Sequence, residues 1–200
     1  MRSLGLQTTD NMGMNQKNKR SDAVTQFEQI VMPHLDAAYN LARWLTRNDH
    51  DAEDLVQMAF TRALKFFDGY QGGNPRAWLL TIVRNTFYTM IRDKQHEHGD
   101  VDFDEATHSS PDESAYGVGS NPEAIITGQD TSRVVQEALE KLPNNFREMI
   151  ILKEIEELSY KEIADIAGIP IGTVMSRLAR ARKLMVAYLD KLGTGAKNGL

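Results

Sequence analysis

The sequence predicts an all-α protein of two small helical domains joined by a flexible, acidic linker. Apolar residues recur at helical spacing, and no stretch alternates apolar and polar residues as a half-buried strand does. Charge is segregated, because residues 95–132 hold nine acids and no Lys or Arg. The same region is rich in Gly and Ser and has no periodicity, which is typical of a linker between helical blocks.

Five segments are expected along the 200 residues. They are a disordered lead-in (1–21), a first helical domain (22–95), the acidic linker (96–121), a second helical domain (122–192) and a flexible tail (193–200). The lead-in lacks the apolar core of a signal peptide, and no run approaches the roughly 18 apolar residues that span a bilayer. We therefore expect a soluble, cytoplasmic protein without membrane insertion.

In the first domain, periodicity predicts a helix from Val24 to about Leu45, and Pro33 is expected to break or kink it. Asp49 or Asp51 is expected to cap a second helix. That helix should run to about Phe67, with these residues buried: Leu55, Val56, Ala59, Phe60, Ala63, Leu64 and Phe67.

A loop with three glycines, 68–73, separates this helix from a third. Asn74 as N-cap and Pro75 at the first helical position predict its start, and it should end near Lys94. Aromatic and basic residues interleave here, as suits unstacked bases and a phosphate backbone: Phe66, Phe67, Tyr70, Trp78, Phe87 and Tyr88, with Lys65, Arg76, Arg84, Arg92 and Lys94. Phe66, Phe67 and Phe87 are better explained as core residues.

The second domain is predicted to contain helices at about 123–141, 144–156, 159–167 and 170–189. The last two carry the strongest local signal. Ser159 and Glu162 form a capping box, Gly168 allows a tight turn, and Pro170 opens the following helix. This pattern predicts a helix-turn-helix, whose second helix enters the major groove of DNA. A solvated basic face on an ordinary helical hairpin is the alternative.

The predicted second helix of this motif is amphipathic. Its polar face would carry Thr173, Ser176, Arg177 and Arg180, and its inward face Val174, Leu178, Ala181 and Met185. Although the formal net charge is −5, the chain outside 95–132 has 23 basic residues against 19 acids. The folded parts are therefore mildly basic, which favours nucleic-acid binding.

Little in the sequence indicates an enzyme. The chain has no cysteine, which excludes disulfides, thiolate catalysis and cysteine zinc sites. His96, His98 and His108 lie among linker carboxylates, but a flexible linker offers no rigid metal geometry. We expect no catalytic residue, no metal and no cofactor, and a metal hydrolase using these histidines is the weakest alternative.

Three stretches together resemble one protein family: DAEDLVQMAFTRAL (51–64), PRAWLLTIVRNTFYTMIRDK (75–94) and LPNNFREMIILKEIEELSYKEIADIAGIPIGTVMSRLARARKL (142–184). The family is the extracytoplasmic-function (ECF) sigma factors, a compact group of the sigma-70 family. With the opening helix the resemblance covers about three quarters of the chain. It implies a sigma region 2 bundle, a region 4 helix-turn-helix, and an alternative sigma factor that directs core RNA polymerase to promoters.

The resemblance also implies roles for individual residues. Binding of the polymerase beta-prime coiled coil would fall to Asp51, Glu53, Asp54, Leu55, Gln57 and Phe60. Melting and recognition of the −10 element would use Phe67, Tyr70, Gln71, Arg76, Trp78, Arg84, Asn85, Tyr88 and Arg92. The −35 element would be read by Ser159, Tyr160, Pro170, Thr173, Met175, Ser176, Arg177, Arg180 and Arg182. The implied partners are core polymerase, through its beta-prime coiled coil and beta flap, promoter DNA and an anti-sigma factor.

Met175 departs from the family pattern, because many members have Arg or Lys there. Arginine can read guanine edges or hold a phosphate, whereas methionine can only touch a thymine methyl group. Base specificity at this position therefore does not carry over. Two other functions stay open: a stand-alone helix-turn-helix regulator, and a sigma-mimicking protein that titrates an anti-sigma factor.

Overall fold

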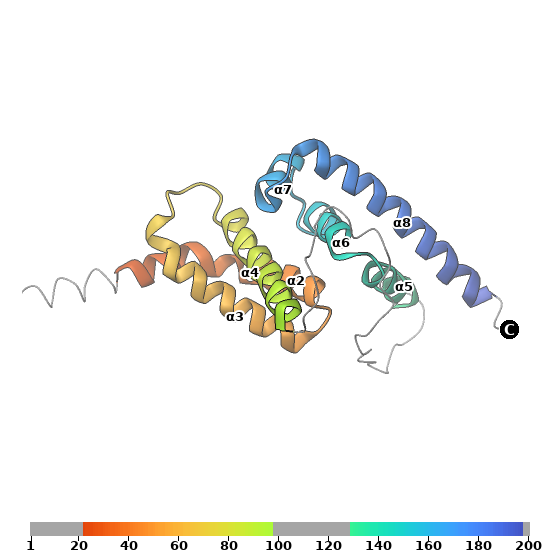
Figure 1. The fold of residues 1–200 in the computed structure, drawn as a ribbon, viewed down its shortest axis with the longest axis horizontal. Helices are drawn as coiled ribbons and strands as arrows, with labels where there is room; N and C mark the ends of the chain where they lie inside the picture. Colours follow the sequence, from red (N-terminus) through yellow and green to blue (C-terminus); the bar gives the residue numbers. More distant parts are fainter. Residues whose placement is uncertain (1–21, 98–128, 198–200) are drawn as a thin grey trace, which may run out of the picture.

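The structure, a computed structural model, describes residues 22–97 and 129–197, all of them in helices, turns or loops (Figure 1). A helix over 22–31 leads into the 3₁₀ turn η1 (Met32–His34), which contains Pro33, and then into α2 (Leu35–Thr46). The predicted interruption at Pro33 is confirmed. It follows from the missing proline N–H and the clash of its ring with the preceding turn.

The cap of α3 (Asp49–Phe66) is Asn48, so the prediction of Asp49 or Asp51 was wrong. Asn48 has an extended backbone, and its side-chain oxygen accepts a hydrogen bond from the backbone N–H of Asp51 at 3.1 Å. Both aspartates lie in the first turn instead, where their charge is favourable near the positive end of the helix dipole.

One face of α3 is buried: Ala52, Leu55, Val56, Ala59 and Ala63. Leu64 is 46% exposed, contrary to expectation, because it follows Ala63 by one residue and so points away from that stripe. Phe66 is 59% exposed, also contrary to expectation, whereas Phe67 and Phe87 are buried as expected.

The turn η2 (Phe67–Gly69) and a loop lead to α4 (Pro75–Glu97). The side-chain oxygen of Asn74 accepts from the Ala77 N–H at 3.1 Å, which confirms the predicted cap. The helix continues past Lys94, into the start of the segment expected as linker. The rest of that segment lies outside the described residues.

The second half consists of α5 (Gln129–Glu140), α6 (Asn144–Ile150) with its π-helical continuation η3 (Ile151–Ile155), α7 (Tyr160–Ala167) and α8 (Ile171–Lys197). The predicted capping box is present: the Ser159 N–H donates to Glu162 at 2.9 Å, and Ser159 Oγ accepts from the Glu162 N–H at 3.3 Å. Gly168 ends α7 at φ 65°, a conformation that costs glycine little. The predicted helix-turn-helix is thus formed.

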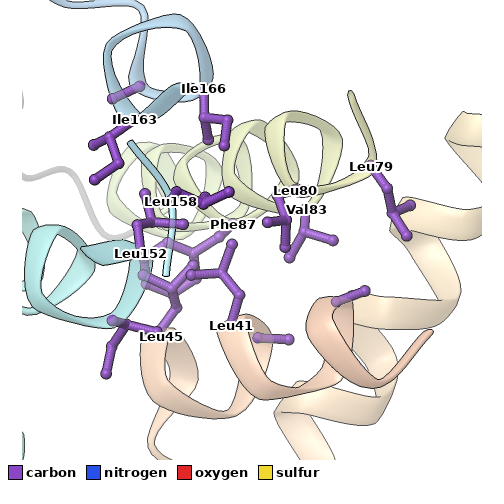
Figure 2. Packing of buried hydrophobic residues seen from close by; sticks show 14 of the residues in the cluster. Leu41, Leu45, Leu79, Leu80, Val83, Phe87, Leu152, Leu158, Ile163 and Ile166 are labelled. Atoms are coloured by element: carbon purple, nitrogen blue, oxygen red, sulfur yellow. The ribbon is translucent and has the colours of Figure 1, made fainter. Parts of the chain in front are cut away.

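The two halves lie side by side and share one hydrophobic core (Figure 1). Helices α2 and α4 of the first half contact α6, η3 and α7 of the second. Figure 2 shows Leu41, Leu45 and Phe87 around Leu152 and Leu158 at this junction. The predicted all-helical class is confirmed, and the structure adds that the halves are packed together.

Arg147 lies at this junction with no exposed surface. Its Nε donates to the Leu139 carbonyl and its Nη1 to the Trp44 carbonyl, both at 2.8 Å, and its Nη2 donates to the Leu142 carbonyl at 2.5 Å. Burial, with the nearby Arg47 charge, lowers the pKa of Arg147 to about 9, so it stays charged at neutral pH. Through these hydrogen bonds, the buried guanidinium of Arg147 links α6, to which it belongs, to the ends of α5 and α2.

Candidate nucleic-acid interface

The inner face of α8 is buried and packs into the hydrophobic core of the helix-turn-helix. Val174, Leu178 and Ala181 are at most 1% exposed, as their spacing predicted. The opposite face of the first turns is open to solvent, with Met175 52% exposed and Ser176 and Arg180 also exposed. Within the residues that the structure describes, this face of α8 is therefore accessible and carries polar and basic side chains, as the predicted recognition helix requires.

The predicted −35 residues differ in how accessible they are. Exposed ones are Ser159, Pro170, Met175, Ser176, Arg180 and Arg182. Thr173 is half-buried, and so is Tyr160, whose ring lies 5.5 Å from Lys153 Nζ. The Ser159 hydroxyl is engaged in the capping box. The Ser176 hydroxyl donates to the Thr173 carbonyl at 3.0 Å and keeps acceptor capacity toward solvent.

Two of the predicted arginines are partly engaged within the second half, Arg177 by burial and Arg182 by a surface ion pair. Arg177 is half-buried, and its buried Nη1 has no hydrogen-bond partner. Arg182 Nη2 donates to Glu154 at 2.7 Å, and this bond, together with one to Tyr160, raises the pKa of Arg182. Arg180 and Lys183 are exposed on the same helix.

An aromatic cluster anchors the loop before α4. Phe67 and Tyr70 stack with centroids 5.9 Å apart, Tyr70 and Trp78 lie 5.1 Å apart, and Phe27 packs edge-on against Phe67. The Tyr70 hydroxyl donates to the Gly73 carbonyl at 3.0 Å. Phe67 is buried and so supports the loop, whereas Gln71 is exposed beyond it. Tyr70 and Trp78 are half-buried.

Further along α4 the predicted −10 residues divide into two sets. Asn85 and Arg92 are both exposed. Arg76, Arg84 and Tyr88 instead meet carboxylates of the second half: Arg76 pairs with Glu156, and Arg84 with Glu148. The Tyr88 hydroxyl donates to Glu148 at 2.9 Å. Burial raises the pKa of Glu148, and the Arg84 charge and these hydrogen bonds counteract the rise.

The α3 surface carries most of the residues expected to meet polymerase. Glu53, Asp54 and Gln57 are exposed, while Asp51 and Phe60 are half-buried. Leu55 is fully buried, so in this structure it supports the helix and has no surface for a partner.

Sequence reasoning missed two apolar residues on the same α3 surface. Met58 and Leu64 are 37% and 46% exposed. Met58 follows Asp54 by four residues and Leu64 follows Gln57 by seven, and these spacings place them on the face of Asp54 and Gln57. That spacing is the signal that could have found them, whereas the hydrophobicity of Leu64 alone predicted a core position.

The residues the structure describes contain no group of three or more potential metal ligands. His96 lies near the end of α4, and His98 and His108 lie outside the described ranges. No helix in 22–97 or 129–197 is long and apolar enough to cross a membrane.

Both halves match known sequence families. Residues 30–97 match Sigma-70 region 2, and residues 132–185 match Sigma-70 region 4. The ECF RNA polymerase sigma factor SigW of Bacillus subtilis is 32% identical over 168 residues, which are 83% of this chain and 90% of the relative. The chain belongs to the ECF sigma factors of the sigma-70 family.

Other ECF sigma factors support the assignment. SigE of Mycolicibacterium smegmatis is 36% identical over 84% of this chain, which spans 63% of that relative's length. The sigma-E factor of Escherichia coli is 35% identical over a stretch that covers 66% of this chain and 71% of that relative's length.

Two solved structures share the fold. The sigma factor RpoE of Bartonella quintana, in complex with the anti-sigma factor NepR, superposes with a TM-score of 0.64 at 31% sequence identity. The superposition covers 82% of this chain and 97% of the RpoE chain. CnrH, in complex with the cytosolic domain of CnrY, gives a TM-score of 0.56 at 25% identity over 86% and 95%. Each superposition therefore includes residues from both helical halves.

Proposed function

We propose that this ECF sigma factor binds core RNA polymerase and directs it to promoters by melting the −10 element and reading the −35 element. The observation that carries the proposal is the presence of regions 2 and 4 in one chain, with an exposed recognition face on α8. The chain performs no bond chemistry in this role, because the polymerase supplies catalysis.

The exposed side chains suit different parts of promoter DNA. On α8, Ser176 and Arg180 can bond base edges or phosphates, and Met175 can contact a thymine methyl group. Near the loop, Gln71 and the half-buried rings of Tyr70 and Trp78 suit a base extruded from the duplex. Extrusion costs a few kcal/mol, which stacking and hydrogen bonds offset.

The polymerase contact is assigned to the exposed surface of α3. Asp54 and Gln57 supply polar groups, and Met58 and Leu64 supply apolar area beside them. Such a mixed surface is typical of a protein interface. We also assign an anti-sigma partner, because RpoE and CnrH were each solved in complex with another protein, NepR as an anti-sigma factor in the first case.

A stand-alone regulator would need only the second half, and it leaves the region 2 match unexplained. A sigma mimic that never binds DNA would not need exposed cations on α8, where Arg180 and Lys183 are exposed. Neither alternative is supported by a specific feature of the structure.

The decisive test adds the protein to core polymerase and sequences the 5′ ends of transcripts made from genomic DNA. A shared upstream motif with −10 and −35 elements is expected. Arg180→Ala should reduce transcription from these promoters at least about tenfold while core binding stays intact. Arg133→Ala, an exposed arginine on α5, is the matched control. Absence of core binding by the wild-type chain would favour the stand-alone regulator.

The polymerase contact is tested by the converse change. Asp54→Ala with Gln57→Ala should weaken binding of core polymerase and leave the helical content unchanged, since both side chains are exposed. An unchanged affinity for core polymerase would contradict the assignment of α3 to the interface.

A further inference from the structure

The exposed face of α8 is divided lengthwise into an apolar side and a polar side. We infer that Met175, on the apolar side, is a specificity-determining residue that selects a thymine in the −35 element by contact with its 5-methyl group. The inference rests on the proposed function for the docking of α8 in the major groove. It deepens that function by naming the chemical group that is read and the base that carries it.

The apolar side consists of residues one helical turn apart. Ile171, Met175 and Ala179 follow one another at intervals of four residues, so they align along one edge of α8. All three are exposed, and the exposed fraction is 49% for Ile171 and 52% for Met175. Single exposed apolar residues are common on protein surfaces, whereas apolar area bordered by charged residues is typical of a binding surface.

The polar side lies next to this row. Ser176, Arg180 and Lys183 follow one another at intervals of four and three residues, and all three are exposed. A hydroxyl group and two cations suit the phosphates of DNA and the acceptor atoms of its bases. The polar side therefore supplies the charged contacts, and the apolar side is left for contacts of another kind.

A carboxylate accompanies the apolar side. Arg182 follows Met175 by seven residues, or two turns, and so continues the same edge of α8. Its Nη2 donates to Glu154 of η3 at 2.7 Å, and the two side chains are 49% and 50% exposed. The positive charge of Arg182 is balanced in this pair, and Glu154 repels phosphate groups. The apolar side is therefore suited to base edges in the groove and not to the DNA backbone.

The chemistry of the major groove identifies the base. The 5-methyl group of thymine is the apolar group that the base pairs present there, among hydrogen-bond donors and acceptors. Methionine is unbranched and has three rotatable bonds, so its terminal methyl group can adjust to that contact, while its sulfur is only a weak acceptor. Ala179 is shorter and Ile171 is stiff at χ1. Met175 is therefore the residue to which we assign the selective contact.

The test removes the methyl group and no hydrogen-bonding atom. Holoenzyme assembled from core polymerase and the full chain is titrated with a labelled duplex of a promoter mapped by 5′-end sequencing. Each thymine of its −35 element is replaced singly by deoxyuridine, which pairs as thymine does but lacks the methyl group. At one position the replacement should weaken binding about fourfold for the wild-type chain, because one buried methyl group is lost. For Met175→Ala the same replacement should change binding less than about 1.5-fold.

Two further variants make the assignment specific. Val186→Ala removes apolar area at a 58% exposed position of the same helix, eleven residues further along, and should keep the fourfold discrimination. Met175→Arg should change the base that is selected at the sensitive position from thymine to guanine, because arginine bonds the guanine edge. This change is measured by transcription from promoters with a randomised −35 element.

Equal binding of the thymine and deoxyuridine duplexes at every position would overturn the inference. A discrimination that survives in Met175→Ala would also overturn it. In both cases, transcription that still depends on Arg180 would leave the proposed function intact. A chain that forms no holoenzyme, or whose holoenzyme selects no upstream motif, would contradict the proposed function and the inference together.

Discussion

At the scale of single residues, Arg147 is the side chain whose role is least evident from the sequence. It is a charged residue with no exposed surface, and its donors are matched by carbonyls at the ends of α2 and α5. A buried cation is tolerated when its donors are satisfied in this way. Arg147 therefore acts as a structural cap and not as a nucleic-acid contact.

Arg147→Met should lower the free energy of unfolding by at least about 3 kcal/mol. Methionine fills part of the volume but leaves several buried carbonyls without a donor. Urea denaturation measures the loss, and Arg133→Met, at an exposed position of α5, should change stability by less than about 0.5 kcal/mol. A small effect of Arg147→Met would mean that water replaces the guanidinium.

The capping box makes a pH-dependent prediction. Hydrogen bonds from the Ser159 backbone N–H and hydroxyl lower the pKa of Glu162 below its ordinary value of 4.5. A lowered folded-state pKa contributes stability that is present above about pH 4.5 and is lost as the pH falls through the folded-state value.

Glu162→Gln should therefore be less stable than the wild type near neutral pH, and the difference should shrink as the pH falls below about 4.5. Urea denaturation over a pH series measures the difference. Ser159→Ala should cost about 1 kcal/mol at neutral pH through the same cap. A difference that grows on acidification would contradict the assigned role of Glu162.

At the scale of elements, the turn of the helix-turn-helix depends on one backbone conformation. Gly168 has φ 65°, and an added Cβ would have no neighbour within 4 Å. Glycine is therefore favoured at position 168 by the backbone conformation and not by a lack of space for a side chain. Gly172, four residues later in α8, lies in equally open space without a positive φ.

Gly168→Ala should destabilise the protein by about 1–2 kcal/mol, because L-residues disfavour the left-handed conformation. Gly172→Ala should instead be neutral or stabilise by up to about 1 kcal/mol, since alanine favours a helix. The pair is compared by thermal and urea unfolding. Equal effects at both positions would exclude the backbone conformation as the reason for glycine at the turn.

At the scale of the whole molecule, the shared core couples the two halves thermodynamically. Both tryptophans, Trp44 and Trp78, lie in the first half. Trp78 lies away from the Arg147 contact, whereas the Trp44 carbonyl accepts from Arg147, so the combined fluorescence reports on the first half and on its junction with the second. Leu152, on η3 of the second half, is fully buried within the common core.

Leu152→Ala should lower the stability monitored by tryptophan fluorescence by about 2–5 kcal/mol, although the substitution is in the other half. Val135→Ala, at a 38% exposed position of α5, should have almost no effect. Circular dichroism should give the same midpoint as fluorescence. An unchanged fluorescence transition in Leu152→Ala would show that the halves unfold independently.

Local chemistry was sufficient to predict most of the helices, the break at Pro33, the Asn74 cap, the Ser159 capping box and the turn at Gly168. Each depends on residues within one or two turns of each other, so a linear pattern contains the information. The inner face of α8 followed from 3.6-residue periodicity for the same reason.

Contacts between residues far apart in the sequence could be identified only in the folded structure. Periodicity shows which face of a helix is apolar, but it does not show which charged residues meet across two helical blocks. Arg84 and Glu148 are 64 residues apart, and Arg147 meets the Trp44 carbonyl across 103 residues. Their pairing depends on how the halves dock, because an ion pair is set by distance and burial in space. Several residues that the family resemblance assigned to DNA are, for that reason, held by carboxylates of their own chain.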